Sequence, residues 1–114
     1  MIEHIKGILK RKEPNSVIID VGGIGYKIAI SLNSFNLLPE LNNELFLSTY
    51  FNVTEKNQEL YGFKDINEKE IFILLISVSG IGPKIAINLL SFIKPDDFKQ
   101  RLIAGEVELL TDLP

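Results

Sequence analysis

The sequence predicts a small β-barrel followed by a short all-α segment, with the change near residue 64. Before that residue, short apolar-rich runs alternate with turn-forming residues, which is typical of strands with one buried face. After it, apolar residues recur every three or four positions, which is typical of amphipathic helices. A glycine-rich turn at 79–84 separates two of the helical runs, so these two helices are expected to form a hairpin.

Five strands are expected in the first part of the chain. Residues 24, 26, 28 and 30 alternate strictly with smaller or polar residues, and 17–21 is a run typical of a buried strand. The expected strands are 2–9, 17–21, 24–30, 44–53 and 59–63. The expected connections include turns at Pro14-Asn15, Gly22-Gly23 and 54–57 and a short helix at 34–38 before Pro39. Together these elements predict a closed barrel of the OB type over residues 1–64.

Residues 65–114 are expected to form an incomplete helical domain with one hairpin. The expected helices are 67–78, 83–93, 95–104 and 106–111. Asp65 and Glu68 predict a capping box at the first helix, in which each side chain accepts a hydrogen bond from the other residue's backbone N–H. Spacing of i, i+3, i+4 and i+7 predicts one buried stripe on each hairpin helix. These stripes are Ile71, Leu74, Leu75 and Val78, and Ala86, Leu89, Leu90 and Ile93.

The turn reads Ser79-Gly80-Ile81-Gly82-Pro83-Lys84. A helix, a Gly-x-Gly turn and a second helix with an early lysine are the signature of a helix-hairpin-helix, which grips nucleic-acid backbone without reading its sequence. Gly80 and Gly82 are expected to allow positive φ and to leave no Cβ that would keep a phosphate away. Pro83 suits the first helical turn, beyond which free N–H groups and the helix dipole favour an anion. Lys84 adds a full charge, although a plain αα-hairpin whose glycines only make the turn remains the alternative.

Two other glycine-rich motifs do not fit this segment, so no nucleotide cofactor is expected. A dinucleotide fingerprint needs a preceding strand and a third small residue, whereas here a helix precedes and Ile85 occupies that place. A Walker loop needs Gly-Lys followed by Ser or Thr, which the sequence lacks.

The composition restricts the function classes further. Cysteine is absent, so no disulfide framework, thiolate metal site or cysteine nucleophile is expected. The single histidine, His4, is expected on a strand face, because zinc needs three or four ligands. No signal peptide is recognisable and the apolar run 71–76 is too short for a membrane span, so a cytoplasmic location is expected. The net charge of −3 argues against nonspecific coating of nucleic acid but leaves binding through one local face open.

A small barrel followed at this spacing by a helix-hairpin-helix resembles the N-terminal part of the RuvA family, the Holliday-junction branch-migration subunits. The resemblance extends from residue 1 to residue 114. The best-matching stretches are IIDVGGIGY at 18–26, LYGF at 60–63, VSGIGPKIA at 78–86 and DLP at 112–114. Each stretch alone is weakly specific, but their order and spacing together are highly specific.

The resemblance implies a non-catalytic bacterial subunit without cofactor or metal. Such subunits form a homotetramer, bind four-way junction DNA regardless of its sequence, and present the arms to the ATP-driven motor RuvB in recombination and repair. The implied DNA-binding residues are Ser79, Gly80, Ile81, Gly82, Pro83 and Lys84. The implied junction-centre pin is Glu55 and Lys56, where an acid repels phosphate. RuvB would dock through a third domain absent from this chain, and the RuvC resolvase is a further implied partner.

This chain departs from the family in two ways. The family commonly has a second acid beside the pin glutamate, whereas this chain has Lys56, so the pin is locally neutral and should repel phosphate less. An ordinary exposed loop at Glu55 and Lys56 is the alternative. The chain also ends where a second hairpin would begin, so we expect a fragment, or a truncated product, of a longer RuvA.

Two other function classes stay open on the sequence alone. A generic OB and helix-hairpin-helix DNA-binding module would lack junction preference and would stack bases on aromatic side chains. The stacking candidates are Phe35, Tyr50, Phe51 and Tyr61, although aromatic residues in so small a barrel are more often core. A glycosylase or nuclease would need a base pocket or a carboxylate cluster for metal. Asp96 and Asp97 follow Pro95 in a helix first turn, where acids favour the dipole, so an enzyme is the least favoured class.

Overall fold

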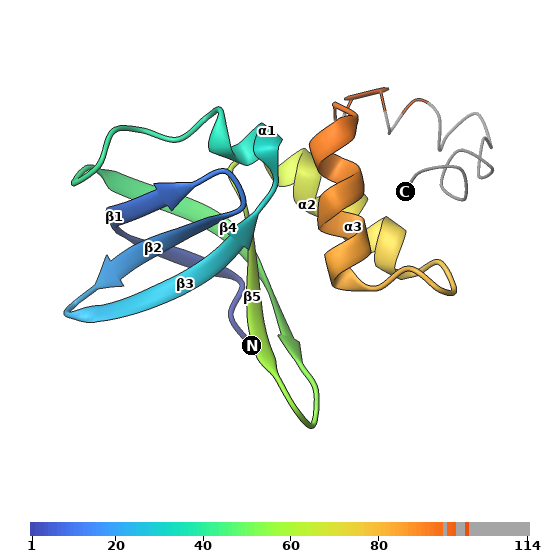
Figure 1. Cartoon of the computed structure of the whole chain (residues 1–114), viewed down its shortest axis with the longest axis horizontal. Coiled ribbons are helices and arrows are strands. Elements are labelled where there is room, and N and C mark those ends of the chain that lie inside the picture. Colours follow the sequence, from blue (N-terminus) through green and yellow to red (C-terminus); the bar gives the residue numbers. More distant parts are fainter. Residues whose placement is uncertain (95, 98–99, 101–114) are drawn as a thin grey trace.

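The computed structural model describes residues 1–94, 96, 97 and 100, and Figure 1 shows a group of strands followed by a pair of helices. The elements in chain order are β1 (His4–Glu13), β2 (Ser16–Val21), β3 (Ile24–Ile30), α1 (Leu32–Phe35), β4 (Glu44–Val53), β5 (Gln58–Phe63), α2 (Ile66–Ile76) and α3 (Pro83–Phe92). The helix expected at 106–111, most of the one expected at 95–104 and the matching stretch at 112–114 lie outside the described residues.

The strands close into a barrel in the order β1-β2-β3-β5-β4, with β4 pairing back to β1. Neighbouring strands are antiparallel except β3 and β5, which are parallel where Ala29 pairs with Tyr61 and Ile30 with Gly62. The short helix α1 lies between β3 and β4 in the chain. This arrangement confirms the predicted five-stranded barrel of the OB type followed by helices.

Alternating side chains of the strands fill the barrel with one apolar core. Its buried members are Ile5, Leu9, Val17, Ile19, Ile28, Ile30, Leu45 and Leu47. Gly62 lies against this core, where an added Cβ would be 2.6 Å from Ile28 Cγ2 and 2.9 Å from Leu47 Cδ1. Glycine is therefore required at this position, because β5 could not pack as closely with any larger residue.

The first strand is longer than the sequence pattern predicts. The apolar-rich run predicts a strand that ends at residue 9, but β1 continues to Glu13, which pairs with Ser16 of β2. The apolar alternation stops where the outer part of this hairpin becomes exposed. Backbone pairing continues without it, and Lys12 Nζ donates to the carbonyl oxygen of Pro39 at 3.1 Å.

A second core fixes the helices to the barrel. Tyr61 and Phe63 of β5 belong to this core, together with side chains of α2 and α3. Phe72 of α2 is fully buried, with its ring centroid 5.5 Å from that of Tyr61 and 4.9 Å from that of Phe63. Figure 1 shows α2 and α3 side by side next to β5. The helical hairpin is therefore held in a defined orientation by aromatic packing.

The buried face of α2 differs from the predicted stripe. Ile71 and Leu75 are buried as predicted, but Leu74 is 53% exposed and Phe72 is buried in its place. The reason is that α2 packs against β4 and β5 as well as α3, so its buried face is turned toward the barrel. The stripe of α3 is confirmed at Ala86, Leu89 and Leu90, which are fully buried.

The predicted N-cap at Asp65 is confirmed, but the predicted reciprocal hydrogen bonds of a capping box between Asp65 and Glu68 are wrong. Asp65 is the N-cap of α2, and its carboxylate accepts from the Asn67 N–H at 2.9 Å. The Glu68 carboxylate instead accepts from the hydroxyls of Ser31 and Ser34, each at 2.8 Å, and is buried against α1. Burial raises the pKa of Glu68, an effect that these hydroxyl hydrogen bonds partly offset. This polar cluster connects the start of α2 to α1.

Candidate nucleic-acid interface

The turn between α2 and α3 is anchored on one side and open on the other. The Ile81 N–H donates to the Val78 carbonyl at 3.1 Å, and the half-buried Ile81 side chain packs against the core of the hairpin. Gly80 has φ +87°, the positive value that the sequence predicts. Ser79 and Gly80 are exposed at the apex. Ile81 therefore holds the turn in place, while the residues before it face solvent.

Gly82 does not have the positive φ that the sequence predicts. Its φ of −89° and ψ of 174° are those of an extended N-cap residue, and its carbonyl accepts from the Ala86 N–H at 3.0 Å. Pro83 is the first residue of α3, as predicted. A Cβ on Gly80 or Gly82 would meet no atom within 4 Å. Neither the backbone angles nor the packing of this protein demands glycine at 82, so the open space in front of α3 is available to a ligand.

The N-terminus of α3 has the features of an anion site. Gly82 has no side-chain acceptor, and no side chain caps the helix. Pro83 has no N–H, so the first free donors are the backbone N–H groups of Lys84 and Ile85. Both lie at the positive end of the helix dipole, which favours a negatively charged ligand such as phosphate.

The Lys84 ammonium lies beside this N-terminus and already has a partner. Its side chain is 79% exposed, and Nζ is 3.7 Å from Oε1 of Glu59 on β5. Glu59 Oε2 also accepts a hydrogen bond from the Tyr61 hydroxyl. Sequence reasoning missed Glu59, because tertiary packing brings β5 next to α3. The sequence does indicate that Glu59 and Tyr61 lie on the same face of the strand, because they are two residues apart.

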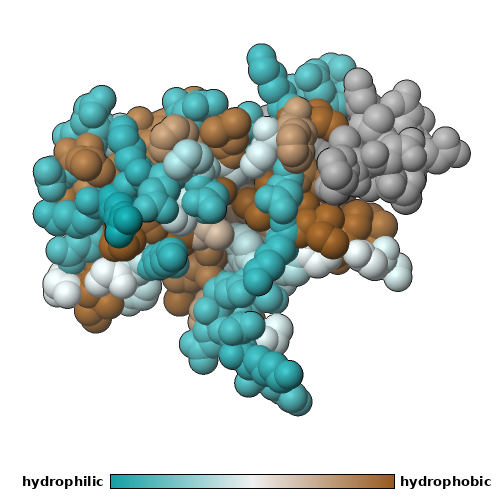
Figure 2. Space-filling model, viewed as in Figure 1, coloured by the Kyte–Doolittle hydropathy of each residue, from teal (hydrophilic) through white to brown (hydrophobic). Residues whose placement is uncertain are grey.

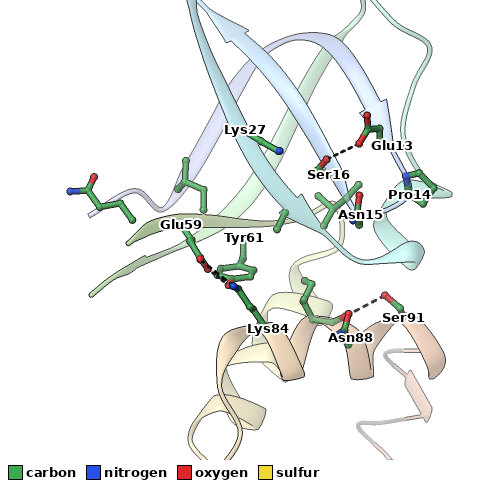
Figure 3. A pocket seen from close by; sticks show the side chains of 15 residues that line it. Glu13, Pro14, Asn15, Ser16, Lys27, Glu59, Tyr61, Lys84, Asn88 and Ser91 are labelled. Carbon is green, nitrogen blue, oxygen red and sulfur yellow. Dashed lines mark hydrogen bonds and ion pairs between the residues drawn. The ribbon is translucent and has the colours of Figure 1, made fainter. Parts of the chain in front are cut away.

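A groove of about 700 Å³ separates α3 from the barrel next to Lys84. Figure 3 shows Lys27 entering it from β3, Glu59 and Tyr61 from β5, and Lys84 and Asn88 from α3. Basic, acidic and amide side chains are mixed along its walls. The charge environment of Lys84 is therefore set by the barrel as well as by its own helix.

The loop that joins β4 to β5 forms the tip of a projecting hairpin. The Thr54 N–H donates to the Asn57 carbonyl at 2.8 Å, and the Asn57 N–H donates to Thr54 Oγ1 at 3.1 Å. Glu55 and Lys56 between them are exposed. Figure 1 shows the hairpin extending away from the barrel, and Figure 2 shows that its tip is hydrophilic. In the view of Figure 1, this tip lies at the bottom, and the 79–82 turn lies at the right, at the lower end of α3.

The aromatic residues proposed for base stacking are largely engaged inside the molecule. Tyr61 is 2% exposed, and the half-buried Tyr50 has its ring centroid 5.4 Å from that of Phe72. Phe35 is half-buried and packs against the barrel core, and Phe51 is half-buried on β4. Base stacking of the kind that a generic single-strand binder uses therefore has little support in these side chains.

Within residues 1–94, 96, 97 and 100, no group of three or more His, Cys, Asp or Glu side chains is arranged to hold a metal ion. No helix in that part of the chain has the length and apolar character needed to cross a membrane. His4 lies on the exposed side of β1, stacked on Phe46 with 5.1 Å between ring centroids, which confirms its predicted place on a strand face.

Two family models match this chain, one over the barrel and one over the helical part. The family model described as RuvA N terminal domain matches residues 1–62, and the one described as SAM-like Helix-hairpin-helix tandem matches residues 72–114.

Three relatives named "Holliday junction branch migration complex subunit RuvA" illustrate the similarity. The protein of Geobacter metallireducens is 41% identical over 114 residues, which are 100% of this chain and 57% of the relative. That of Amoebophilus asiaticus is 41% identical over 106 residues, 93% of this chain and 55% of the relative. That of Coxiella burnetii is 39% identical over 114 residues, again 100% and 57%. This chain thus spans just over half the length of these relatives, and it belongs to the RuvA family.

Proposed function

We propose that this chain is the DNA-binding N-terminal part of a non-catalytic subunit that binds four-way junctions during branch migration. The observation that supports this most strongly is the uncapped start of α3, where two free N–H groups lie behind a glycine that neither the backbone nor the packing requires. The names of the relatives supply the type of DNA.

The proposed phosphate site is the turn Ser79-Gly80-Ile81-Gly82-Pro83-Lys84. A phosphate oxygen would accept from the N–H groups of Lys84 and Ile85, while Gly80 and Gly82 allow the backbone to approach. Such contacts read no base, so binding is independent of sequence. The Ile81 side chain packs inward and holds the turn in shape.

The proposed pin is the tip of the β4–β5 hairpin. Glu55 and Lys56 are exposed there, and the tip projects beyond the barrel in Figure 1. A carboxylate at the centre of a junction repels phosphate and helps to keep the crossing strands apart. Lys56 offsets this charge, so the pin should repel phosphate less than a pin with two acids would.

The proposed assembly is a bacterial, cytoplasmic homotetramer that hands junction arms to RuvB, with RuvC as a further partner. ATP hydrolysis belongs to RuvB, and the subunit needs no cofactor. We further propose that residues 1–64 provide tetramer contacts and the pin, while 65–114 provide the DNA-binding hairpin.

Hydrogen exchange of backbone amides tests this proposal on both surfaces at once. A saturating four-way junction should slow exchange in the 79–86 segment and in the 53–58 segment, whereas a linear duplex should protect the first segment alone. Equal protection by both DNAs would favour a generic helix-hairpin-helix module. Protection of neither segment, with binding established, would place the interface elsewhere and refute the proposal.

A further inference from the structure

The Lys84 ammonium, which we expect to contact DNA phosphate, forms an ion pair with an acid of the protein itself. Lys84 Nζ lies 3.7 Å from Glu59 Oε1, and a phosphate drawn to the start of α3 would have to compete with that carboxylate. Figure 3 shows the Glu59 and Lys84 side chains meeting across the gap between β5 and α3. The pair therefore connects the barrel directly to the proposed phosphate site.

The carboxylate is the fixed member of this pair. Glu59 Oε2 accepts a hydrogen bond from the Tyr61 hydroxyl, and the Tyr61 side chain is 2% exposed in the second core. Burial, and then the hydrogen bond and the charge of Glu59, raise the pKa of Tyr61 far above its ordinary value, so its hydroxyl stays a donor. The Glu59 side chain is 29% exposed and that of Lys84 is 79% exposed. The lysine can therefore move away, while the carboxylate stays beside the site.

The second acid in the groove has a different partner. Glu13 also lines the groove, but its carboxylate is paired with Arg11 Nη2 at 2.8 Å. Lys27 of β3 also lines the barrel side of the groove and is exposed. Among the described residues that line the groove, Glu59 is thus the acid that contacts the hairpin lysine.

We propose that Glu59 is an intramolecular competitor of DNA phosphate for Lys84 and that it limits the affinity of the hairpin for DNA. The proposal rests on the function proposed above. Bound phosphate is attracted less strongly by a Lys84 that is already paired with Glu59. An exposed pair of this kind weakens binding by about two- to fivefold for each hairpin. An effect of this size keeps DNA binding by each hairpin weak enough for the DNA to be released as the junction arms move.

The test is Glu59→Gln, which removes the charge and keeps an oxygen that can accept from Tyr61. At about 50 mM salt, it should bind a labelled four-way junction more tightly than the parent chain, by about two- to fivefold for each hairpin engaged, with the gain shrinking as salt rises. The matched control is Glu13→Gln, which makes the same change of net charge in the same groove. The gain of Glu59→Gln over this control should disappear when Lys84→Ala is added to both.

The affinities are compared once thermal unfolding shows that every variant is folded. Equal affinities for Glu59→Gln and Glu13→Gln would overturn the role of Glu59. A gain for Glu59→Gln that persists in the Lys84→Ala background would show that it does not act through Lys84, which also overturns the proposal. DNA binding that is tight in the parent chain and unchanged by Lys84→Ala would reject the competition and leave junction binding intact. No junction binding by the parent chain or by Glu59→Gln would reject the proposed function together with this inference.

Discussion

Replacing Gly82 by serine should separate the proposed DNA-binding role of the turn from its structural role. Gly82 is an extended N-cap residue with φ −89°, and a Cβ there would meet no atom within 4 Å. Serine adopts this conformation without strain and is a preferred N-cap. Its hydroxyl oxygen would accept from the N–H of Lys84 or Ile85, the same donors that we assign to phosphate. The substitution should therefore stabilise the protein while it weakens DNA binding.

The two expected magnitudes have opposite signs. A capping side chain adds a few tenths of a kcal/mol over glycine, and a less flexible unfolded chain adds about 0.4–1 kcal/mol. The free energy of unfolding should thus rise by roughly 0.5–1.5 kcal/mol. Loss of one hydrogen bond from a backbone N–H to a charged phosphate costs about 1.5–3 kcal/mol, which corresponds to roughly ten- to hundredfold weaker binding.

Urea unfolding followed by circular dichroism and anisotropy titrations with a labelled four-way junction measure these two quantities. Gly80→Ala is the contrasting variant, because φ is +87° at that position and alanine there should cost about 1–2 kcal/mol of stability. Gly82→Ser that is more stable than the parent chain and binds the junction equally well would refute the assignment of phosphate to the start of α3.

Three further predictions address the lysine, the joining core and the buried acid. Lys84→Ala should lower the slope of log affinity against log salt by about 0.9 for each phosphate that is no longer neutralised, and an unchanged slope would place Lys84 outside the interface. Phe72→Ala should lower the free energy of unfolding by about 3–5 kcal/mol, because its fully buried ring packs on three aromatic neighbours. A urea midpoint close to that of the parent chain would contradict that role. Burial raises the pKa of Glu68 above 4.5, so its contribution to stability is complete below the unfolded-state pKa and is lost as pH rises through the folded-state pKa. In Glu68→Gln, the free energy of unfolding measured with urea should no longer show this decrease as pH rises. A pH profile that is unaltered by the substitution would show that another group is responsible.

Much of the barrel is predictable from the sequence, because strand alternation and turn residues are local signals. Alternation at 24–30 and the turns at 14–15 and 22–23 match the observed hairpins of β1, β2 and β3. The end of β1 is not predictable in this way, since both faces of its last residues are polar and only pairing with β2 keeps them extended. Phe72 could not be assigned to the buried face from helical spacing, because the aromatic face of β5 that covers it is set by tertiary packing.

In the candidate site as well, local sequence signals predict some features, and long-range contacts determine the others. The glycine-proline turn predicts the reversal at Gly80 and the start of α3 at Pro83, and both are confirmed. Glycine is common both at positive φ and at N-caps, so its presence at 82 did not distinguish between the two. The partners of Glu68 lie 34 and 37 residues earlier in the chain, and only the folded arrangement brings them together.

A gel-shift competition tests the central claim most directly, namely that this chain recognises a four-way junction through its helix-hairpin-helix turn. A labelled junction would be bound at moderate salt and challenged with excess linear duplex of equal length, with light scattering on the same sample to give the oligomeric state. We expect a tetramer that keeps the junction in the presence of linear competitor, and weaker retention by Gly82→Ser. A monomer that releases the junction to linear duplex, or a Gly82→Ser variant that retains it as well as the parent chain, would contradict it.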